Sequence, residues 1–270
     1  MKAEIPVFSL QQGQSPLLVS IPHAGTHLPS WLLPRLTPQA RQLVDTDWHL
    51  PRLYDFLAEM DVTLLVATHS RYVVDLNRPP DDVSLYPGQS TTGLCPVDDF
   101  VGNPLYLTDA APQQSERHAR IDAYWRPYHA ALESELARLK ALHGHVVQWD
   151  AHSIHSHVPR FFDGELPHLN FGTADHQACD GALIEQLVET VQSNSDYSWV
   201  VNGRFKGGYI TRHYGQPASG IHALQLEMAM RTYMPETAFI PEFDDTFAQP
   251  ARTLLRTLLE SALQWRPANP

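Results

Sequence analysis

Two histidines and a glutamate come directly after apolar runs that have the composition of β-strands: His23, His152 and Glu227. Ligands of open parallel sheets bind beyond the carboxyl ends of the strands, so we expect these three side chains to converge on one crevice. Two histidines and one carboxylate, with a fourth position left for water, form the ligand set of catalytic zinc. The sequence therefore predicts a site for one divalent metal ion, and zinc is the metal that this set favours.

The carboxylate of this ligand set is expected to be Asp47, in the segment 45–49. A helical pattern of leucines begins just after this segment, at Leu50. Asp45 or Asp47 could therefore be a helix N-cap instead of a metal ligand, and spacing alone does not decide between the two.

His152 also has two interpretations. Together with His155 and His157 it alternates with serines, which is typical of a solvated loop. Asp150 lies two residues before it, however, and a metal-binding histidine usually donates its second N–H to a nearby carboxylate or carbonyl. This spacing favours the metal-site interpretation, with Asp150 as the acceptor.

Glu227 has the properties expected of a general base. In the run 221–228 the odd-numbered positions share one face of a strand, and Glu227 stands at its end among apolar residues. Such a setting raises the pKa of a carboxyl group toward neutrality, which suits proton transfer at physiological pH. The alternative is a surface salt bridge to Arg231.

Several cations could bind an anionic substrate. Arg78 follows a predicted strand, and its planar guanidinium matches a carboxylate. Arg204, Lys206 and Arg212 cluster within the glycine-rich stretch 202–215. Each of them taken singly could also be a solvated surface residue. The glycines match no phosphate-loop spacing, so nucleotide binding is not supported.

Composition excludes other classes of function. The chain has 270 residues and a net charge of −11, which disfavours nucleic acid and anionic membranes as partners. It carries no apolar stretch of membrane-spanning length, no signal-peptide pattern and no Gly-x-Ser-x-Gly motif of serine hydrolases. Cys95 and Cys179 are far apart and are expected to be free thiols. We expect a cytoplasmic protein.

The elements that must position these residues are those of a single α/β domain, residues 1–270, with a largely parallel sheet. Six apolar runs are expected to form strands: residues 17–21, 62–68, 72–76, 146–149, 199–201 and 221–226. Helical periodicity predicts helices over 115–142, with a kink at Pro127, over 181–192 and over 247–265. The irregular stretches 25–45 and 79–108 exceed ordinary connections, and the second has the composition of an ordered lid.

The chain resembles the N-formylglutamate amidohydrolases over nearly its whole length. The resemblance rests on seven segments in one order: SIPHAG (20–25), DTDWH (45–49), VDLNRPP (74–80), DAHS (150–153), NFG (170–172), GGYITRHYG (207–215) and LQLEM (224–228).

This family is similar in fold to the zinc carboxypeptidases, with a mixed sheet flanked by helices (phosphorylase/hydrolase-like). The resemblance implies His23 and His152 as metal ligands, and Asp47 where the carboxypeptidases have a ligand glutamate. Their His-x-x-Glu motif is absent, because Thr26 occupies the position of the glutamate. Glu227 resembles their catalytic glutamate.

Asn77 and Arg78 resemble the asparagine–arginine pair that binds a substrate carboxylate in the carboxypeptidases. The implied reaction is hydrolysis of N-formyl-L-glutamate to L-glutamate and formate, in histidine degradation. Arg71 or Arg78 would stabilise the oxyanion. A substrate with two carboxylates needs more than one cation, which Arg78 and Arg212 would supply, with Arg204 or Lys206 in reserve.

Two other functions remain open from the sequence. One is metal-dependent hydrolysis of another N-acyl amino acid or amide. The other is a non-catalytic protein that binds a metal or an acidic metabolite, which would need no general base at Glu227 and would saturate the metal with four protein ligands.

Overall fold

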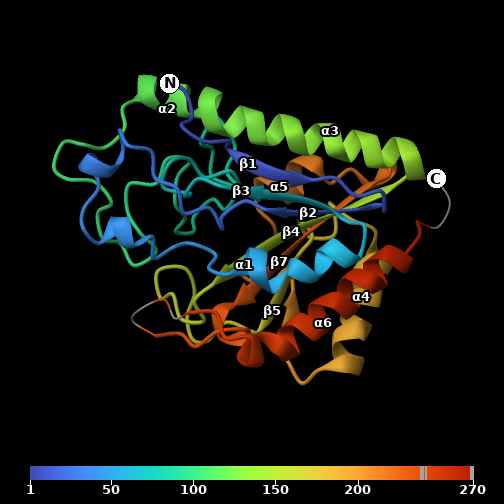
Figure 1. Cartoon of the computed structure of the whole chain (residues 1–270). Coiled ribbons are helices and arrows are strands. Elements are labelled where there is room, and N and C mark those ends of the chain that lie inside the picture. Colours follow the sequence, from blue (N-terminus) through green and yellow to red (C-terminus); the bar gives the residue numbers. More distant parts are fainter. Residues whose placement is uncertain (238–239, 241, 268–270) are drawn as a thin grey trace.

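The computed structural model describes residues 1–237, 240 and 242–267, and the centre of this part of the chain is one seven-stranded sheet (Figure 1). The strands are β1 (Phe8–Gln11), β2 (Leu17–Ile21), β3 (Thr63–Ala67), β4 (Val146–Ile154), β5 (Leu169–Gly172), β6 (Trp199–Val201) and β7 (Ile221–Ala229). Their order is β1-β3-β2-β4-β7-β5-β6, and the four central strands are mutually parallel. β1 is antiparallel to β3, and β5 is antiparallel to β7. The predicted mixed, largely parallel α/β sheet is confirmed.

Helices cover both faces of this sheet (Figure 1). The long helix α3 lies across one face, whereas α4 and α6 pack together on the other. Their bounds, with those of the shorter helices, are α1 (Leu50–Leu53), α2 (Gln114–Arg120), α3 (Arg126–His143), α4 (Gly181–Asn194), α5 (Tyr209–Tyr214) and α6 (Asp245–Gln264). The three predicted helices are confirmed. In the first of them, a π-helical turn at Ile121–Trp125 separates α2 from α3 just before Pro127.

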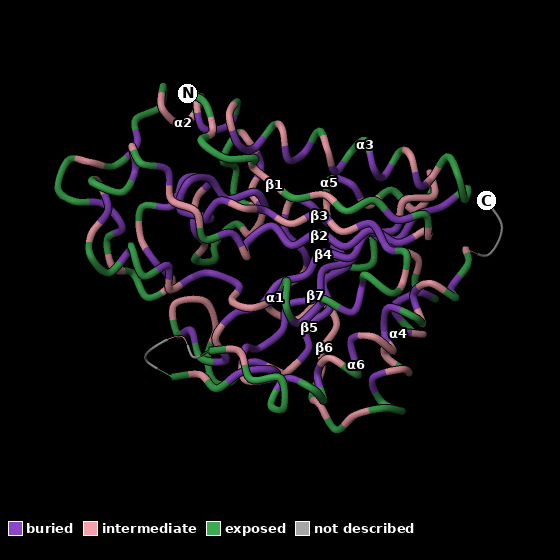
Figure 2. The backbone as a smooth tube through the Cα atoms, in the orientation of Figure 1, coloured by how far each residue is buried: buried purple, intermediate pink, exposed green. Residues whose placement is uncertain are grey.

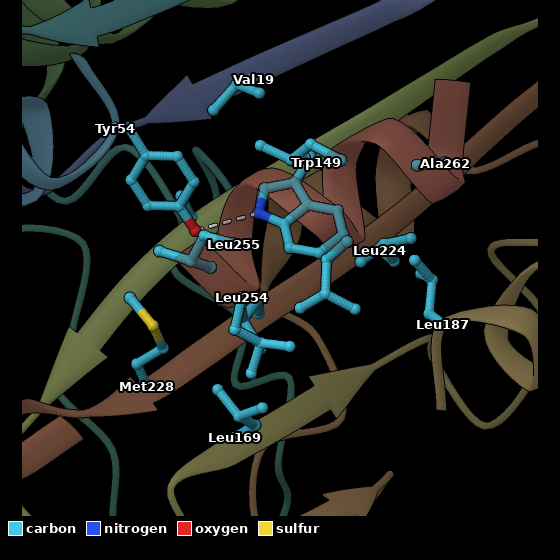
Figure 3. Close-up of a cluster of buried hydrophobic side chains, with 14 of the residues drawn as sticks. Val19, Tyr54, Trp149, Leu169, Leu187, Leu224, Met228, Leu254, Leu255 and Ala262 are labelled. Carbon is cyan, nitrogen blue, oxygen red and sulfur yellow. Dashed lines mark hydrogen bonds between the residues drawn. The ribbon is translucent and has the colours of Figure 1, made fainter. Parts of the chain in front are cut away.

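Two hydrophobic cores form because the side chains of the buried strands alternate between the two faces. In β2, Leu17, Val19 and Ile21 enter the core under α4 and α6, whereas Leu18 enters the core under α3. The first core is centred on Trp149, whose indole Nε1 donates to the hydroxyl of Tyr54 (Figure 3). Figure 2 shows β2 and β4, at the centre of the sheet, buried over their whole length.

One predicted strand, residues 72–76, is wrong. This segment forms consecutive turns, in which the amide of Val73 donates to the carbonyl of Ser70 and the amide of Asn77 donates to the carboxylate of Asp75. Its apolar side chains are nevertheless buried in the core under α3, which explains the strand-like composition. Turn formation by Ser70 and Asp75 side chains prevailed over β-propensity.

Two strands were not predicted, and two are longer than predicted. β1 and β5 are short, with four residues each. β4 and β7 each extend over nine residues, so His152 and Glu227 lie within the strands and not after them. Among the described residues, no helix is both long and apolar enough to cross a membrane. Cys95 and Cys179 are buried free thiols, as predicted.

Candidate metal and substrate site

The parallel strands bring the predicted residues to one edge of the sheet. His23 follows the end of β2, and the amide of Asp47 donates to its carbonyl oxygen. In the register of β4 and β7, His152 lies directly opposite Glu227. Both side chains point to the face covered by α3, because Trp149 and Leu226 fill the opposite face. The expected convergence is therefore observed.

His23, Asp47 and His152 form a buried group that could hold a metal ion. One possible ligand atom from each residue lies within 4.8 Å of the others. Asp47 Oδ2 lies 3.1 Å from Nδ1 of His152 and 3.9 Å from Nδ1 of His23. Asp47 is not a helix N-cap: the N-cap of α1 is His49, and Asp47 accepts a hydrogen bond from the amide of Ser153.

A second carboxylate stands behind each histidine ring. Nε2 of His152 lies 2.8 Å from Oδ2 of Asp150, the partner predicted from spacing. Nε2 of His23 lies 2.7 Å from Oδ1 of Asp75, which sequence reasoning did not assign to the site. These contacts place the Nε2 proton toward the carboxylate and leave both Nδ1 atoms facing Asp47. The sequence feature that could have identified Asp75 as a site residue is its position two residues before Asn77, in the same segment as Arg78.

The charges of this group fit a dication. Three buried carboxylates, those of Asp47, Asp75 and Asp150, surround the two histidines. The buried guanidinium that offsets them is that of Arg71, which lies 2.6 Å from Asp75 and 4.0 Å from Asp47. Two negative charges remain, and buried charges need partners. A divalent cation would balance them.

The pKa shifts agree with this balance. Burial lowers the pKa of His23, which keeps its ring neutral as a ligand must be. Burial acts in the same direction on His152, but the carboxylates of Asp150 and Asp47 prevail and raise the pKa of its ring well above the ordinary value. The position between these carboxylates therefore attracts positive charge, which a proton or a metal ion can supply.

Glu227 lies beside this group and has the raised pKa that its sequence context predicted. Burial raises the pKa of its carboxyl group to about 8. The side-chain amide of Gln225 donates to Oε2 of Glu227 at 3.1 Å and accepts from the amide of Gly208. Gln225 was not assigned to the site, although it shares the predicted strand face. The alternative pairing of Glu227 with Arg231 is wrong, because Arg231 pairs with Glu165.

A pocket opens over these residues, and three arginines line it. Arg71 is committed to Asp75, but Arg78 and Arg204 have no carboxylate of the described residues within 4.0 Å. Arg78 donates to the carbonyls of Asn77 and Thr92.

The other two predicted cations lie outside the lining of this pocket. Arg212 donates to the carbonyl of Gly207 and packs on the ring of Tyr86, and Lys206 pairs with Asp175. Neither side chain lines the pocket itself, so their part in substrate binding stays a prediction.

Asn77 lines the pocket, but its side chain is engaged by the protein. Its amide Nδ2 donates to Asp150 at 3.2 Å and lies 2.9 Å from Nε2 of His152. Its Oδ1 accepts from the amide of Ile210 at the start of α5. Asn77 thus links the histidine–aspartate group to the glycine-rich segment. Position 208 needs a glycine, because a Cβ there would lie 2.4 Å from the amide nitrogen of the Asn77 side chain.

The long segment 79–108 supplies part of the pocket wall through Tyr86, Ser90 and Phe100. The hydroxyl of Tyr86 donates to the carbonyl of Gly207 and accepts from the amide of Lys206. This segment is therefore fastened to the glycine-rich segment 202–215. Its function as a lid stays a prediction.

Comparison with known proteins places the chain in a family. Residues 15–234 match the N-formylglutamate amidohydrolase family. The N-formylglutamate deformylase of Pseudomonas putida is 49% identical, with 96% of each chain covered. That of Pseudomonas aeruginosa is 51% identical, with 96% of this chain and 97% of the relative covered.

Solved structures give the same result. The crystal structure of the N-formylglutamate amidohydrolase from Ralstonia eutropha JMP134 superposes with a TM-score of 0.81 at 27% identity, and covers 96% of this chain and 97% of that chain. A gene product of Agrobacterium tumefaciens shares the fold, with a TM-score of 0.72 at 18% identity and coverage of 95% and 94%. The family match over residues 15–234 and the curated relatives at 49% and 51% identity establish that the chain belongs to the N-formylglutamate amidohydrolase family.

Proposed function

We propose that this protein hydrolyses N-formyl-L-glutamate to L-glutamate and formate, with one divalent metal ion held by His23, Asp47 and His152. The observation that carries the proposal is the set of residues that line a single pocket. It combines the buried histidine–aspartate group, the buried Glu227 and two guanidinium groups that have no carboxylate partner in the described part of the chain. The name of the curated relatives at 49% and 51% identity supports the same substrate.

Two imidazoles and one carboxylate are a ligand set that favours zinc. The metal ion would act as a Lewis acid and would lower the pKa of a water molecule. Glu227 accepts a proton from the attacking water and transfers it to the nitrogen of the leaving amine. Gln225 holds the carboxyl group of Glu227 in position through its hydrogen bond to Oε2.

Arg71 is the proposed donor to the oxyanion that forms at the formyl carbon. Its guanidinium is fixed by Asp75 and packs over the ring of Phe100, 4.7 Å from the ring centroid. Its Nε is buried and has no partner among the described residues. A donor that is fixed in advance and left unpaired is suited to stabilise charge that develops during the reaction.

The substrate is a dianion, and Arg78 and Arg204 are the proposed contacts for its two carboxylates. A charge-assisted bond to a half-buried guanidinium is stronger than one in water. We further propose that residues 1–270 form one domain, since one sheet collects strands from residue 8 to residue 229. The proposed substrate implies a role in histidine degradation, which we propose takes place in the cytoplasm.

The test is release of the free amino acid by purified protein whose metal content is measured in the same sample. We expect about one divalent ion per chain, loss of turnover on chelation and recovery on addition of Zn²⁺. N-Formyl-L-glutamate should be preferred over N-formyl-L-aspartate and N-acetyl-L-glutamate. Full activity in metal-free protein would contradict the metal-dependent reaction. Preference for the acetyl substrate would assign the pocket to another deacylase, and tight binding without turnover would favour a binding protein.

A further inference from the structure

Arg78 and Arg204 line one pocket and have no carboxylate partner among the described residues. The question is therefore which substrate carboxylate each arginine binds. The α-carboxylate of an N-formylamino acid is attached to the carbon that bears the reacting amide. The side-chain carboxylate of glutamate lies two methylene groups further away. The two carboxylates must therefore be bound at different distances from the histidine–aspartate group.

Arg78 lies on the side of the pocket near that group. It directly follows Asn77, whose side chain contacts both His152 and Asp150. Its Nη1 also donates to the carbonyl of Asn77 at 3.2 Å. Arg78 is thus positioned for the carboxylate nearest the reacting amide.

Arg204 belongs to a different wall of the pocket. Its Nε donates to the carbonyl of Phe161 at 2.6 Å, and its Nη2 donates to the carbonyl of Ser90 at 3.1 Å. Its guanidinium also packs on three rings, at 5.4 Å from that of Tyr86, 5.9 Å from that of Phe161 and 5.3 Å from that of Phe205. These contacts fix the guanidinium, yet none of them neutralises its charge.

The surroundings of Arg204 favour binding of an anion at the end of an apolar chain. Burial lowers the pKa of its guanidinium against the opposing charges of Tyr86 and Glu227, and the charge of Arg78 acts in the same direction as burial. A bound carboxylate would offset both effects. Phe161 and Phe205 line the same wall and offer apolar surface to methylene groups.

We propose that Arg204 binds the side-chain carboxylate of the substrate and is the residue that selects an acidic side chain. This inference rests on the proposed function and goes beyond it, because it divides the two carboxylates between two arginines. Arg78 binds the α-carboxylate, and Arg204 reads the side chain. Because both Nη1 hydrogens of Arg204 lack a partner among the described residues, they are available to a carboxylate oxygen.

The test uses three substrates that differ in one charge: N-formyl-L-glutamate, N-formyl-L-glutamine and N-formyl-L-isoglutamine, in which the α-carboxylate is an amide. Arg204→Gln should lower kcat/KM for N-formyl-L-glutamate and for the isoglutamine derivative by about a hundredfold, through KM. It should change kcat/KM for the glutamine derivative by less than about threefold, because that substrate has no side-chain charge to lose. Arg204→Lys should restore part of the loss, since it keeps the charge without the planar fork.

Arg160→Gln is the matched control. Arg160 also contacts Phe161 and Ser90, but it pairs with Asp98 and does not line the pocket. A disturbance of this wall alone should change the rates of all three substrates by one common factor. An equal loss on all three substrates with Arg204→Gln, or a loss confined to substrates with an α-carboxylate, would overturn the assignment. Inactivity of the unmodified protein on N-formyl-L-glutamate would instead overturn the proposed function.

Discussion

The histidines at this site are oriented by the carboxylates behind them. Asp75 and Asp150 are fully buried, and each lies within 2.8 Å of the Nε2 atom of a ring. A carboxylate in this position selects the tautomer with a lone pair on the other nitrogen and makes that nitrogen a stronger ligand. The two carboxylates therefore belong to the proposed metal site as much as the histidines do.

Asp75→Asn is expected to lower metal affinity by about 10- to 100-fold, because it removes the charge behind His23 while it keeps the shape of the side chain. The measurement is competition with a chromophoric chelator. Asp45→Asn is the matched control: Asp45 is buried nearby, but its carboxylate accepts from the amide of Phe100 and not from a ring. Equal affinities of Asp75→Asn and the unmodified protein would show that the carboxylate does not support the ligand.

Glu227→Gln should leave metal content unchanged and lower kcat by about 10²- to 10⁴-fold, because the amide cannot accept the proton of water. Glutamine has the shape of glutamate, and its side-chain oxygen can still accept the hydrogen bond from Gln225. The check is formate release and metal content in one preparation. A rate near that of the unmodified protein would remove Glu227 from the reaction.

Sequence reasoning identified the site residues whose chemistry is unusual for their position. His23, His152 and Glu227 stand at the end of apolar runs, where polar side chains need a reason. Asp75 was not assigned to the site, because its partner comes from a distant part of the chain. Gln225 was not assigned either, although its partner Glu227 lies only two residues away. Only the folded sheet brings Asp75 to His23, 52 residues away.

At the scale of elements, the parallel register of β4 and β7 does most to assemble the site. It pairs His152 with Glu227 and Asp150 with Gln225 on one face. Periodicity predicted the face of β7, because side chains alternate in any strand. Periodicity did not predict where β4 and β7 end. Both strands are buried on both faces, and polar site residues occupy positions close to their carboxyl ends. The strand predicted at residues 72–76 was wrong for the opposite reason. The apolar side chains of this segment are buried in the core although its backbone does not join the sheet.

Tyr86→Phe tests how the segment 79–108 is attached to the glycine-rich segment. The change removes the two hydrogen bonds of the hydroxyl with Gly207 and Lys206 and keeps the ring under Arg204. We expect KM for N-formyl-L-glutamate to rise by up to about 30-fold, which corresponds to the loss of two hydrogen bonds of about 1 kcal/mol each, with kcat changed little. Steady-state kinetics is the measurement. An unchanged KM would mean that the hydroxyl contacts do not hold the wall in place.

At the scale of the whole molecule, the sheet separates two cores, and the site lies in the layer between the sheet and α3. His129 of α3 contacts the segment 74–80, which supplies Asp75, Asn77 and Arg78 and is called the site segment below. Its Nε2 lies 2.8 Å from the carbonyl of Leu76, and its Nδ1 lies 2.9 Å from the hydroxyl of Tyr214. The neutral ring satisfies both contacts, with Nε2–H as donor and Nδ1 as acceptor. Burial disfavours a second ring proton, because it would place a charge in a site removed from water.

Burial accordingly lowers the pKa of His129 from 6.5 to about 3. As pH falls below 6.5, the unfolded chain takes up a proton that the folded protein does not, so stability falls with pH until about pH 3. The slope is about 1.4 kcal/mol per pH unit, which gives a loss of about 2 kcal/mol between pH 7 and pH 5 from this residue. His129→Gln, which cannot titrate, should lose about 2 kcal/mol less over that interval in urea unfolding at pH 7, 6 and 5. His118→Gln, at an exposed position of α2, is the control and should keep the pH dependence of the unmodified protein. If His129→Gln also kept that dependence, the buried ring would have to be protonated in the folded protein, and the neutral link between α3 and the site segment would be disproved.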